Sequence, residues 1–304
     1  MKLITFHRHD GRVRTGVVLN QQVLDISDWI ETLPVSAQAL AHHQRAGTLP
    51  PVGGMLRWLS AGPDALPKLQ DHVAWGAVPD VDLADVSLYA PVPRPGKIIG
   101  VGRNYADHAK ETGVAPFEKP RIIFKMSSSV VAPGAPVVRP PGVTKLDFES
   151  ELAVVIGAYG RHIPEAQALE HVAGYTVLND VSAREFQFDI SPAQTTFAKS
   201  MDGFCPIGPV LLTAEALPNP QDLEISTHVN GQRMQHASTR DMLFPVATLI
   251  AYVSQYMTLE PGDVLTTGTP AGIGAFRSPP VWLAAGDKVE VHIAPIGTLE
   301  THIG

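Results

Sequence analysis

Residues 147–157 read DFESELAVVIG, an acidic start followed by an apolar run. Residues two apart in a β-strand share a face, so the residues from Leu152 to Ile156 alternate between two faces that are both apolar. A strand that is apolar on both faces is typical of the interior of a protein. The stretch therefore predicts a buried strand with Glu149 and Glu151 on one face at its mouth.

The two glutamates at this strand mouth favour a cation site. Carboxylates that lie close together and out of water repel one another and lose hydration unless a positive charge compensates them. Oxygen ligands suit Mg²⁺ or Mn²⁺, and also Ca²⁺. For a Glu-x-Glu pair alone, a solvated strand end is the alternative interpretation.

A second apolar strand that ends in an acid follows at residues 174–187, GYTVLNDVSAREFQ. Asp180 is the candidate third carboxylate of the same site, and a helix N-cap is its alternative role. Arg184 and Gln187 are three residues apart and share one face of a helical turn. They are predicted either to hold a substrate carboxylate or to pair with the acids.

Residues 102–111, GRNYADHAKE, contain a candidate general base. His108 and Glu111 are neighbours on a helix surface because they are separated by three positions. A carboxylate beside an imidazole orients the ring and raises its basicity, which proton abstraction requires. An exposed surface pair is the alternative interpretation.

Two lysines and one turn complete the candidate site. Lys125 and Lys199 lie among apolar and small residues, and a buried lysine needs an anionic ligand or an acid as its partner. A side chain that extends to the surface is the alternative for each. Residues 266–274, TTGTPAGIG, form a glycine-rich turn that can hold an oxyanion, although the turn lacks the lysine of a phosphate-binding loop.

The remaining patterns describe many short strands and a few helices. The predicted strands are residues 2–8, 14–20, 21–27, 97–102, 121–126, 263–270 and 287–294, with a hairpin over 224–236 around Asn230-Gly231. The predicted helices cover residues 36–46, 54–75 with interruptions at Pro63 and Pro67, and a segment from Pro245 to Met257. The fold class is therefore mostly β with some helix (α+β).

A proline-rich connector separates two parts of the chain. Residues 89–96, YAPVPRPG, hold three prolines, which cannot donate hydrogen bonds to a central strand ladder. We predict a small α+β N-terminal domain over 1–92 and a catalytic domain over 93–304.

Composition limits the class of protein. The 304 residues carry a net charge of −7, which argues against a binder of nucleic acid or anionic membrane. No apolar run approaches the ~20 residues of a membrane helix, and the N-terminus is too polar for a signal peptide. The single cysteine excludes an intrachain disulfide and a multi-thiolate metal site. A cytoplasmic location is the expectation.

In their order along the chain, these motifs resemble the fumarylacetoacetate hydrolase family over about residues 97–302. The elements that carry the resemblance are GRNYADHAKE, FKMSSS, DFESELAVVIG, GYTVLNDVSAREFQ, KSMDGFCPIGP, the VNG hairpin and TGTPAGIG. The resemblance implies a mixed β-roll catalytic domain in a homodimer. It also implies a Mg²⁺ or Mn²⁺ site at Glu149, Glu151 and Asp180.

For the other residues, the resemblance implies roles in catalysis. His108 and Glu111 would be the water-activating dyad, and Lys199 and Thr269 match positions that contact substrate. Lys125, Arg184 and Gln187 are further candidates for substrate binding.

The implied reaction is hydrolysis of a C–C bond in a 2,4-dioxo acid of the acylpyruvate or fumarylpyruvate type, as in aromatic-compound catabolism. The metal would bind the substrate's 1-carboxylate and 2-oxo group, and His108 would activate the water that attacks C4. Decarboxylation of oxaloacetate and isomerisation of a 2-hydroxy-diene-dioate would use the same pyruvate-type enolate, so they are the alternatives. A non-enzymatic ligand-binding protein is disfavoured because it needs no base.

Overall fold

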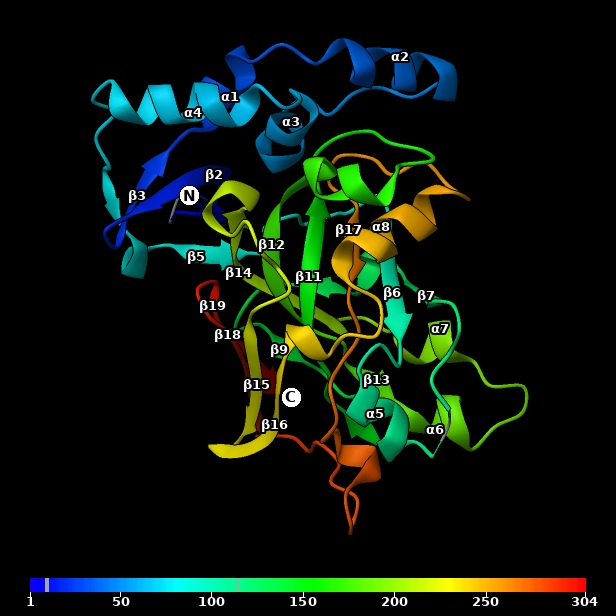
Figure 1. Cartoon of the computed structure of the whole chain (residues 1–304). Helices are drawn as coiled ribbons and strands as arrows, with labels where there is room; N and C mark the ends of the chain where they lie inside the picture. The colour runs from blue at the N-terminus through cyan, green and yellow to red at the C-terminus, as the bar shows by residue number, and fades with distance from the viewer. Residues whose placement is uncertain (9–10, 114) are drawn as a thin grey trace.

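The computed structural model describes residues 1–8, 11–113 and 115–304. Within these ranges, one large mixed sheet of twelve strands runs through the molecule (Figure 1). Its strands in spatial order are β4 (Val81–Asp82), β3 (Gln22–Asp25), β2 (Val13–Leu19), β1 (Lys2–His7), β14 (Cys205–Thr213), β12 (Val172–Asn179), β11 (Ser150–Ile156), β17 (Val264–Thr266), β6 (Ile98–Gly102) and β7 (Arg121–Lys125). Two short strands lie beside this path: β5 (Ser87–Tyr89) pairs with β1, and β8 (Val130–Val131) pairs with β14.

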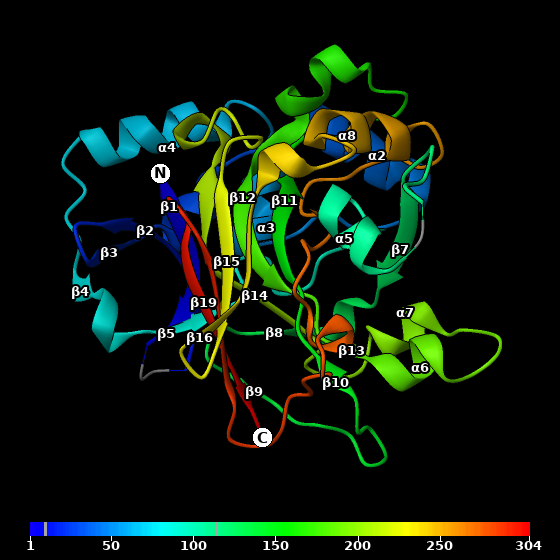
Figure 2. The same ribbon diagram turned by 60° about the horizontal axis from the view of Figure 1, so that its bottom comes forward.

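A five-stranded sheet packs against one face of the large sheet. Its order is β16 (Gln232–Ser238), β15 (Glu224–Val229), β18 (Lys288–Ile293), β19 (Gly297–Ile303) and β9 (Pro136–Val137). Strands β18 and β19 contact β12, and β15 contacts β11. Figure 2 shows β15, β16 and β19 of this sheet from a second direction. A separate two-stranded pair joins β10 (Leu146–Asp147) to β13 (Ser182–Ala183).

Helices cover the opposite face and the edges, and α8 (Val246–Ser254) packs into the core shared with the five-stranded sheet. The other helices are α1 (Ser27–Thr32), α2 (Ala37–Ala46), α3 (Gly54–Ser60), α4 (Ala65–Ala74), α5 (Ala106–Glu111), α6 (Arg184–Phe188) and α7 (Thr195–Ala198). The first four gather at one end of the molecule (Figure 1). Buried side chains of α1, α3 and α4 share one apolar core with the large sheet. No helix in the described ranges is long and apolar enough to span a membrane.

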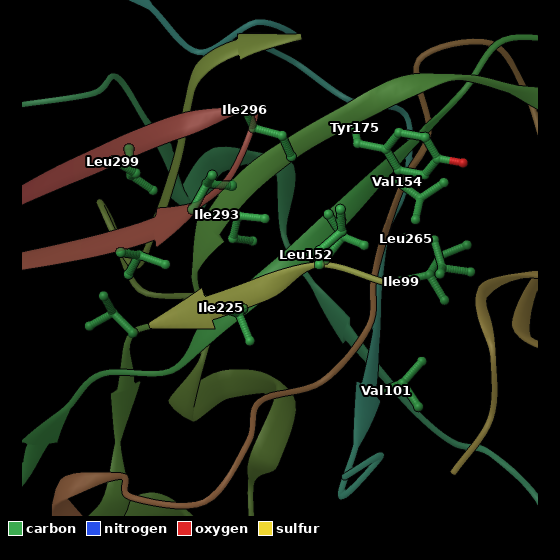
Figure 3. Close-up of a cluster of buried hydrophobic side chains, with 14 of the residues drawn as sticks. Ile99, Val101, Leu152, Val154, Tyr175, Ile225, Leu265, Ile293, Ile296 and Leu299 are labelled. Carbon is green, nitrogen blue, oxygen red and sulfur yellow. The ribbon is translucent and has the colours of Figure 1, made fainter. Parts of the chain in front are cut away.

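The central strand β11 is buried on both faces, as the sequence predicts. Leu152, Val154 and Ile156 belong to the core shared with the five-stranded sheet. Figure 3 shows Leu152 and Val154 in this core. Ala153 and Val155 belong to the core beneath the N-terminal helices. All five side chains are fully buried, so the ends of β11 are held in place from both sides.

The helical segment predicted over 54–75 is interrupted at Pro63, as expected, where Gly62 adopts a left-handed φ of +89° and Pro63 cannot donate a backbone hydrogen bond. The second predicted interruption, at Pro67, is wrong: Pro67 lies in the first turn of α4, where a backbone N–H has no partner within the helix. One other predicted helix is too long. The helix that begins after Pro245 ends at Ser254 and does not reach Met257. The chain turns there so that Leu259 can form a bridge with Gly160.

The N-terminal strands extend the large sheet. Strand β1 pairs antiparallel with β14, and β2 to β4 continue outward from it. The predicted hairpin over 224–236 is confirmed, and Asn230 and Gly231 both have positive φ, as a tight hairpin turn requires. The predicted division at residue 92 stays a prediction.

Replacing Leu152 with Ala tests how much the two-sided burial of β11 stabilises the fold. We expect the free energy of unfolding to fall by about 2–5 kcal/mol, because a fully buried leucine leaves a cavity. Urea unfolding followed by circular dichroism measures the change. Val138→Ala, at a side chain that is 63% exposed, is the control and should alter stability by less than about 0.5 kcal/mol. Equal effects would contradict the assignment of Leu152 to the core.

Candidate active site

Three carboxylates meet where β11 begins and β12 ends. Glu149 directly precedes β11, Glu151 is its second residue, and Asp180 directly follows β12. The two strands are antiparallel and paired, and the Asp180 backbone N–H donates to the Glu149 carbonyl at 2.8 Å. One carboxylate oxygen from each residue lies within 4.8 Å of the others, and all three residues are buried. We name this group the acidic cluster.

Two lysines and an arginine neutralise most of the acidic cluster. Lys199 Nζ donates to Glu149 Oε2 at 2.8 Å and to Asp180 Oδ2 at 2.7 Å. Lys125 Nζ donates to the other Asp180 oxygen at 2.6 Å. Arg184 Nη2 lies 2.7 Å from Glu149 Oε1. Both lysines are buried and have acidic partners, so neither side chain extends to the surface.

Glu151 is the carboxylate left without a cationic partner. In the described part of the chain no lysine or arginine forms an ion pair with it, and its Oε2 accepts from the Gly268 backbone N–H at 2.8 Å. Burial, then the charges of Asp180 and Glu149, raises the pKa of Glu151 to about 8. Burial also favours the neutral form of Glu149, but Lys199 and Arg184 overcome it and hold the pKa of Glu149 at about 2.

The acidic cluster therefore fits a divalent cation. Three buried carboxylates supply hard oxygen ligands of the kind that Mg²⁺ and Mn²⁺ prefer. A cation beside Glu151 would supply the positive charge that this side chain lacks. Glu149, Glu151 and Asp180 are the residues that would hold it.

His108 and Glu111 form a fixed pair on α5. Glu111 Oε2 lies 3.0 Å from His108 Nδ1, and Glu111 Oε1 accepts from the Gly272 backbone N–H at 3.0 Å. His108 is only 6% exposed, which contradicts the alternative of an exposed surface pair. The carboxylate is anchored from a second loop, so it can orient the imidazole in the manner that a general base requires.

The structure brings all the predicted site residues together. One pocket is lined by His108, Glu149, Glu151, Asp180, Arg184, Gln187, Lys199 and Thr269. Glu111 lies behind His108, and Lys125 lies behind Asp180.

Arg184 and Gln187 share one face of the short helix α6, as their spacing predicts. Arg184 Nη1 donates to Gln187 Oε1 at 2.7 Å, and its Nε donates to Asp147 Oδ2 at 2.8 Å. Together with its contact to Glu149, this makes Arg184 a partner of the acids, which is one of the two predicted roles. Substrate binding by Arg184 and Gln187 stays a prediction.

Sequence reasoning missed two residues that position this site. Asp147 accepts from Arg184 and from the backbone N–H groups of Gly274 and Ala275, which ties the glycine-rich turn to the site. Gln235 donates to Thr269 Oγ1 at 2.8 Å and accepts from the Ser150 backbone N–H at 3.0 Å. Asp147 opens the motif that predicts the acidic strand mouth, so its place there was a usable signal. Gln235 has no such local signal.

Residues 97–304 match the family described as fumarylacetoacetate (FAA) hydrolase C-terminal. The chain belongs to the fumarylacetoacetate hydrolase family. It is 43% identical over 245 residues to a protein of Homo sapiens named as a mitochondrial oxaloacetate tautomerase. The matched region covers 81% of this chain and 78% of that protein.

Two solved structures of the family are similar over the whole chain. A 2-hydroxyhepta-2,4-diene-1,7-dioate isomerase from Mycobacterium marinum is 31% identical with a TM-score of 0.71, over 100% of this chain and 98% of its own. A maleylpyruvate hydrolase from Sphingobium sp. SYK-6, in complex with manganese(II) and pyruvate, is 29% identical with a TM-score of 0.75. The similarity covers 100% of this chain and 98% of the hydrolase chain. The predicted family and fold are confirmed, and the chain is an enzyme of a superfamily with several reaction types.

Glu151→Gln tests whether the acidic cluster holds a divalent cation. Wild-type protein should gain thermal stability when Mn²⁺ or Mg²⁺ is added, because an ion bound to the native state stabilises it. We expect Glu151→Gln to lose most of that gain, since one anionic ligand is removed. Differential scanning fluorimetry with and without the ions measures the shift.

The same variant has a second expected effect when a chelator is present. The pKa of Glu151 is about 8 in the folded protein, above its value of ~4.5 in the unfolded chain. Protonated Glu151 therefore contributes fully to the stability of the fold below pH ~4.5, and this contribution is lost as the pH rises to about 8. At pH 8.5 the glutamine variant should therefore melt at or above the wild-type temperature. A variant that melts lower and still responds to Mn²⁺ would show that Glu151 is a structural residue.

Proposed function

We propose that this protein is a divalent-metal-dependent enzyme that interconverts the keto and enol forms of an oxaloacetate-like 2-oxo acid. The observation that carries the proposal is the buried His108, which Glu111 orients and which lines the same pocket as the acidic cluster. The 43% identity to an oxaloacetate tautomerase favours this reaction over the others known for the superfamily.

Bound at Glu149, Glu151 and Asp180, a Mg²⁺ or Mn²⁺ ion would act as a Lewis acid toward the substrate's carboxylate and 2-oxo oxygens and would stabilise the negative charge of the enolate. Lys199 lies against the same carboxylates and adds positive charge beside the developing oxyanion.

His108 supplies the proton transfer. When Glu111 accepts a hydrogen bond from Nδ1–H, the other ring nitrogen, Nε2, carries the lone pair. In this tautomer His108 can take a proton from C3 of the keto acid, and protonation of the 2-oxo oxygen by the resulting imidazolium or by water completes the enol. In the reverse direction the oxygen loses its proton and C3 receives one from the imidazolium. The dyad therefore serves both directions of a keto–enol exchange.

Hydrolysis of a C–C bond in a 2,4-dioxo acid is the second candidate function. The same His108 would take a proton from a water molecule that attacks C4, and the leaving group would be the enolate of pyruvate. The similarity to a maleylpyruvate hydrolase supports this reaction. Decarboxylation of oxaloacetate would use the same enolate without a base.

The homodimer and the cytoplasmic location stay predictions, and the human relative is named as mitochondrial.

His108→Ala tests the proton-transfer role. We expect tautomerisation of oxaloacetate, followed by the enol absorbance, to slow by about 10²–10⁴-fold, the usual contribution of a general base. Glu111→Gln should slow it less, because the imidazole remains in place. Mn²⁺ affinity should stay unchanged, since His108 is not a proposed ligand. His302→Ala, at an exposed histidine on β19, is the matched control.

A second reaction measured on the same variant distinguishes base from positioning residue. Decarboxylation of oxaloacetate requires no base, so it should survive His108→Ala much better than tautomerisation or acylpyruvate hydrolysis does. Equal losses in all three reactions would mean that His108 acts by holding the substrate, and the base would have to be another group.

Removal of divalent ions tests the metal requirement. Protein treated with EDTA and desalted should lose its turnover, and Mn²⁺ or Mg²⁺ should restore it, because the proposed enolate requires a Lewis acid. Full activity in chelated protein, with the metal content checked by mass spectrometry, would overturn the metal-dependent mechanism.

A further inference from the structure

Besides Arg184, which pairs with Glu149, two further arginines line the active-site pocket. Arg103 and Arg121 line the same pocket as His108 and Glu151. Across the described residues, no carboxylate forms an ion pair or a hydrogen bond with either guanidinium. Arg103 does contact an aromatic ring: its Cζ lies 5.6 Å from the centre of the Phe117 ring. We name these two residues the arginine pair.

Arg121 lies beside a glycine of the neighbouring strand. Arg121 lies directly opposite Gly102 in the antiparallel ladder of β6 and β7. A Cβ atom at Gly102 would lie 3.5 Å from Arg121 Cδ and 3.0 Å from Ile123 Cδ1. The glycine thus leaves open the surface over which the Arg121 side chain lies.

Arg103 follows Gly102 and has an unusual backbone. Its φ is +58°, a left-handed value that a residue with a side chain rarely adopts. Burial, and then the charge of Arg121, lowers the pKa of Arg103. Two guanidinium groups that have no carboxylate partner among the described residues thus line one pocket, and an anion bound between them would offset their like charges.

Strand register relates the arginine pair to the acidic cluster. Glu151 accepts from the Gly268 backbone N–H, just beyond the paired part of β17. When the parallel pairing of β17 with β6 is continued, Gly268 falls opposite Gly102, and Gly102 faces Arg121. Three strand spacings, about 14 Å, separate the backbones of Glu151 and Arg121. Arg121 is exposed and Glu151 is buried, and both line the pocket together with the apolar Ile123, Ile273 and Phe276.

We propose that the arginine pair binds the distal carboxylate of a 2-oxo dicarboxylic acid whose 2-oxo acid end lies at the acidic cluster. The inference rests on the proposed function and specifies its substrate class. Guanidinium groups suit this role because they form paired, charge-assisted hydrogen bonds with a carboxylate. A substrate with one carboxylate, such as a simple acylpyruvate, would leave the arginine pair without a partner.

Binding of stable 2-oxo acids tests the proposal without turnover. Isothermal titration calorimetry on Mn²⁺-loaded protein compares two matched pairs, 2-oxoglutarate with 2-oxopentanoate and 2-oxoadipate with 2-oxohexanoate. Within each pair only the distal carboxylate differs. We expect wild-type protein to bind at least one diacid about 10–100-fold more tightly than its monoacid, the range that a charge-assisted hydrogen bond gives.

Variants of Arg103 and Arg121 test whether the arginine pair causes the tighter binding of diacids. Arg121→Gln should remove most of the diacid preference, and the double change with Arg103→Gln should remove all of it, while monoacid binding stays the same. Arg121→Lys should keep part of it, since the charge remains without the paired geometry. Arg139→Gln, at an exposed arginine outside the pocket, is the matched control and should keep the full preference.

The outcomes separate this inference from the proposed function. Monoacids that bind with no diacid preference at either length, or a preference that survives the double variant, would overturn the role of the arginine pair alone. Mn²⁺-loaded protein that binds none of the four acids would overturn the proposed function and this inference with it.

Discussion

The ammonium group of Lys199 is the interaction on which the site depends. It lies between Glu149 and Asp180, at the adjoining ends of two buried strands, and a third hydrogen bond joins it to Ser182. Without a cation at this point, the two strand ends would bring like charges together away from water, at a cost of several kcal/mol per ion. Lys199 thus makes it possible for two buried strands to have acidic residues at their adjoining ends. Glu151 is then the one carboxylate of the acidic cluster whose charge no lysine or arginine of the described residues balances.

The parts of the pocket differ in how firmly the fold holds them. Glu151 lies on β11, and Glu149 and Asp180 lie directly beside the ends of β11 and β12, two strands covered by apolar cores on both faces. Such rigid elements hold a metal ligand or a catalytic group precisely. His108 lies on a helix of six residues and is held by one carboxylate and the loop behind it. Arg121 lies on β7, the edge strand at this end of the large sheet. The acidic cluster is therefore held more firmly than His108, and His108 more firmly than Arg121, which would bind the distal end of the substrate.

Local patterns in the sequence predict those features that depend on neighbouring residues. The alternation from Leu152 to Ile156 predicts a strand buried on both faces, and the spacing of His108 and Glu111 predicts their contact. The roles of Gln235 and Arg121 depend instead on which strands become neighbours, and register between distant segments leaves no local signal. Helix α1 was missed for a related reason, because its six residues have no side-chain cap and are too few to show a helical period.

The pairing of β1 with β14 has a consequence for the order of folding. Lys2 lies opposite Leu212, so the first strand of the chain finds its place in the sheet only after more than two hundred further residues have been synthesised. Contacts between such distant segments form slowly because a long loop must close first. During synthesis β5 can pair with Thr5 to His7 of β1, but the edge at Lys2 and Leu3 stays unpaired until β14 is made. An unpaired strand edge of this kind favours association with other chains. Completion of the large sheet is thus a late event that protects the nascent protein from aggregation.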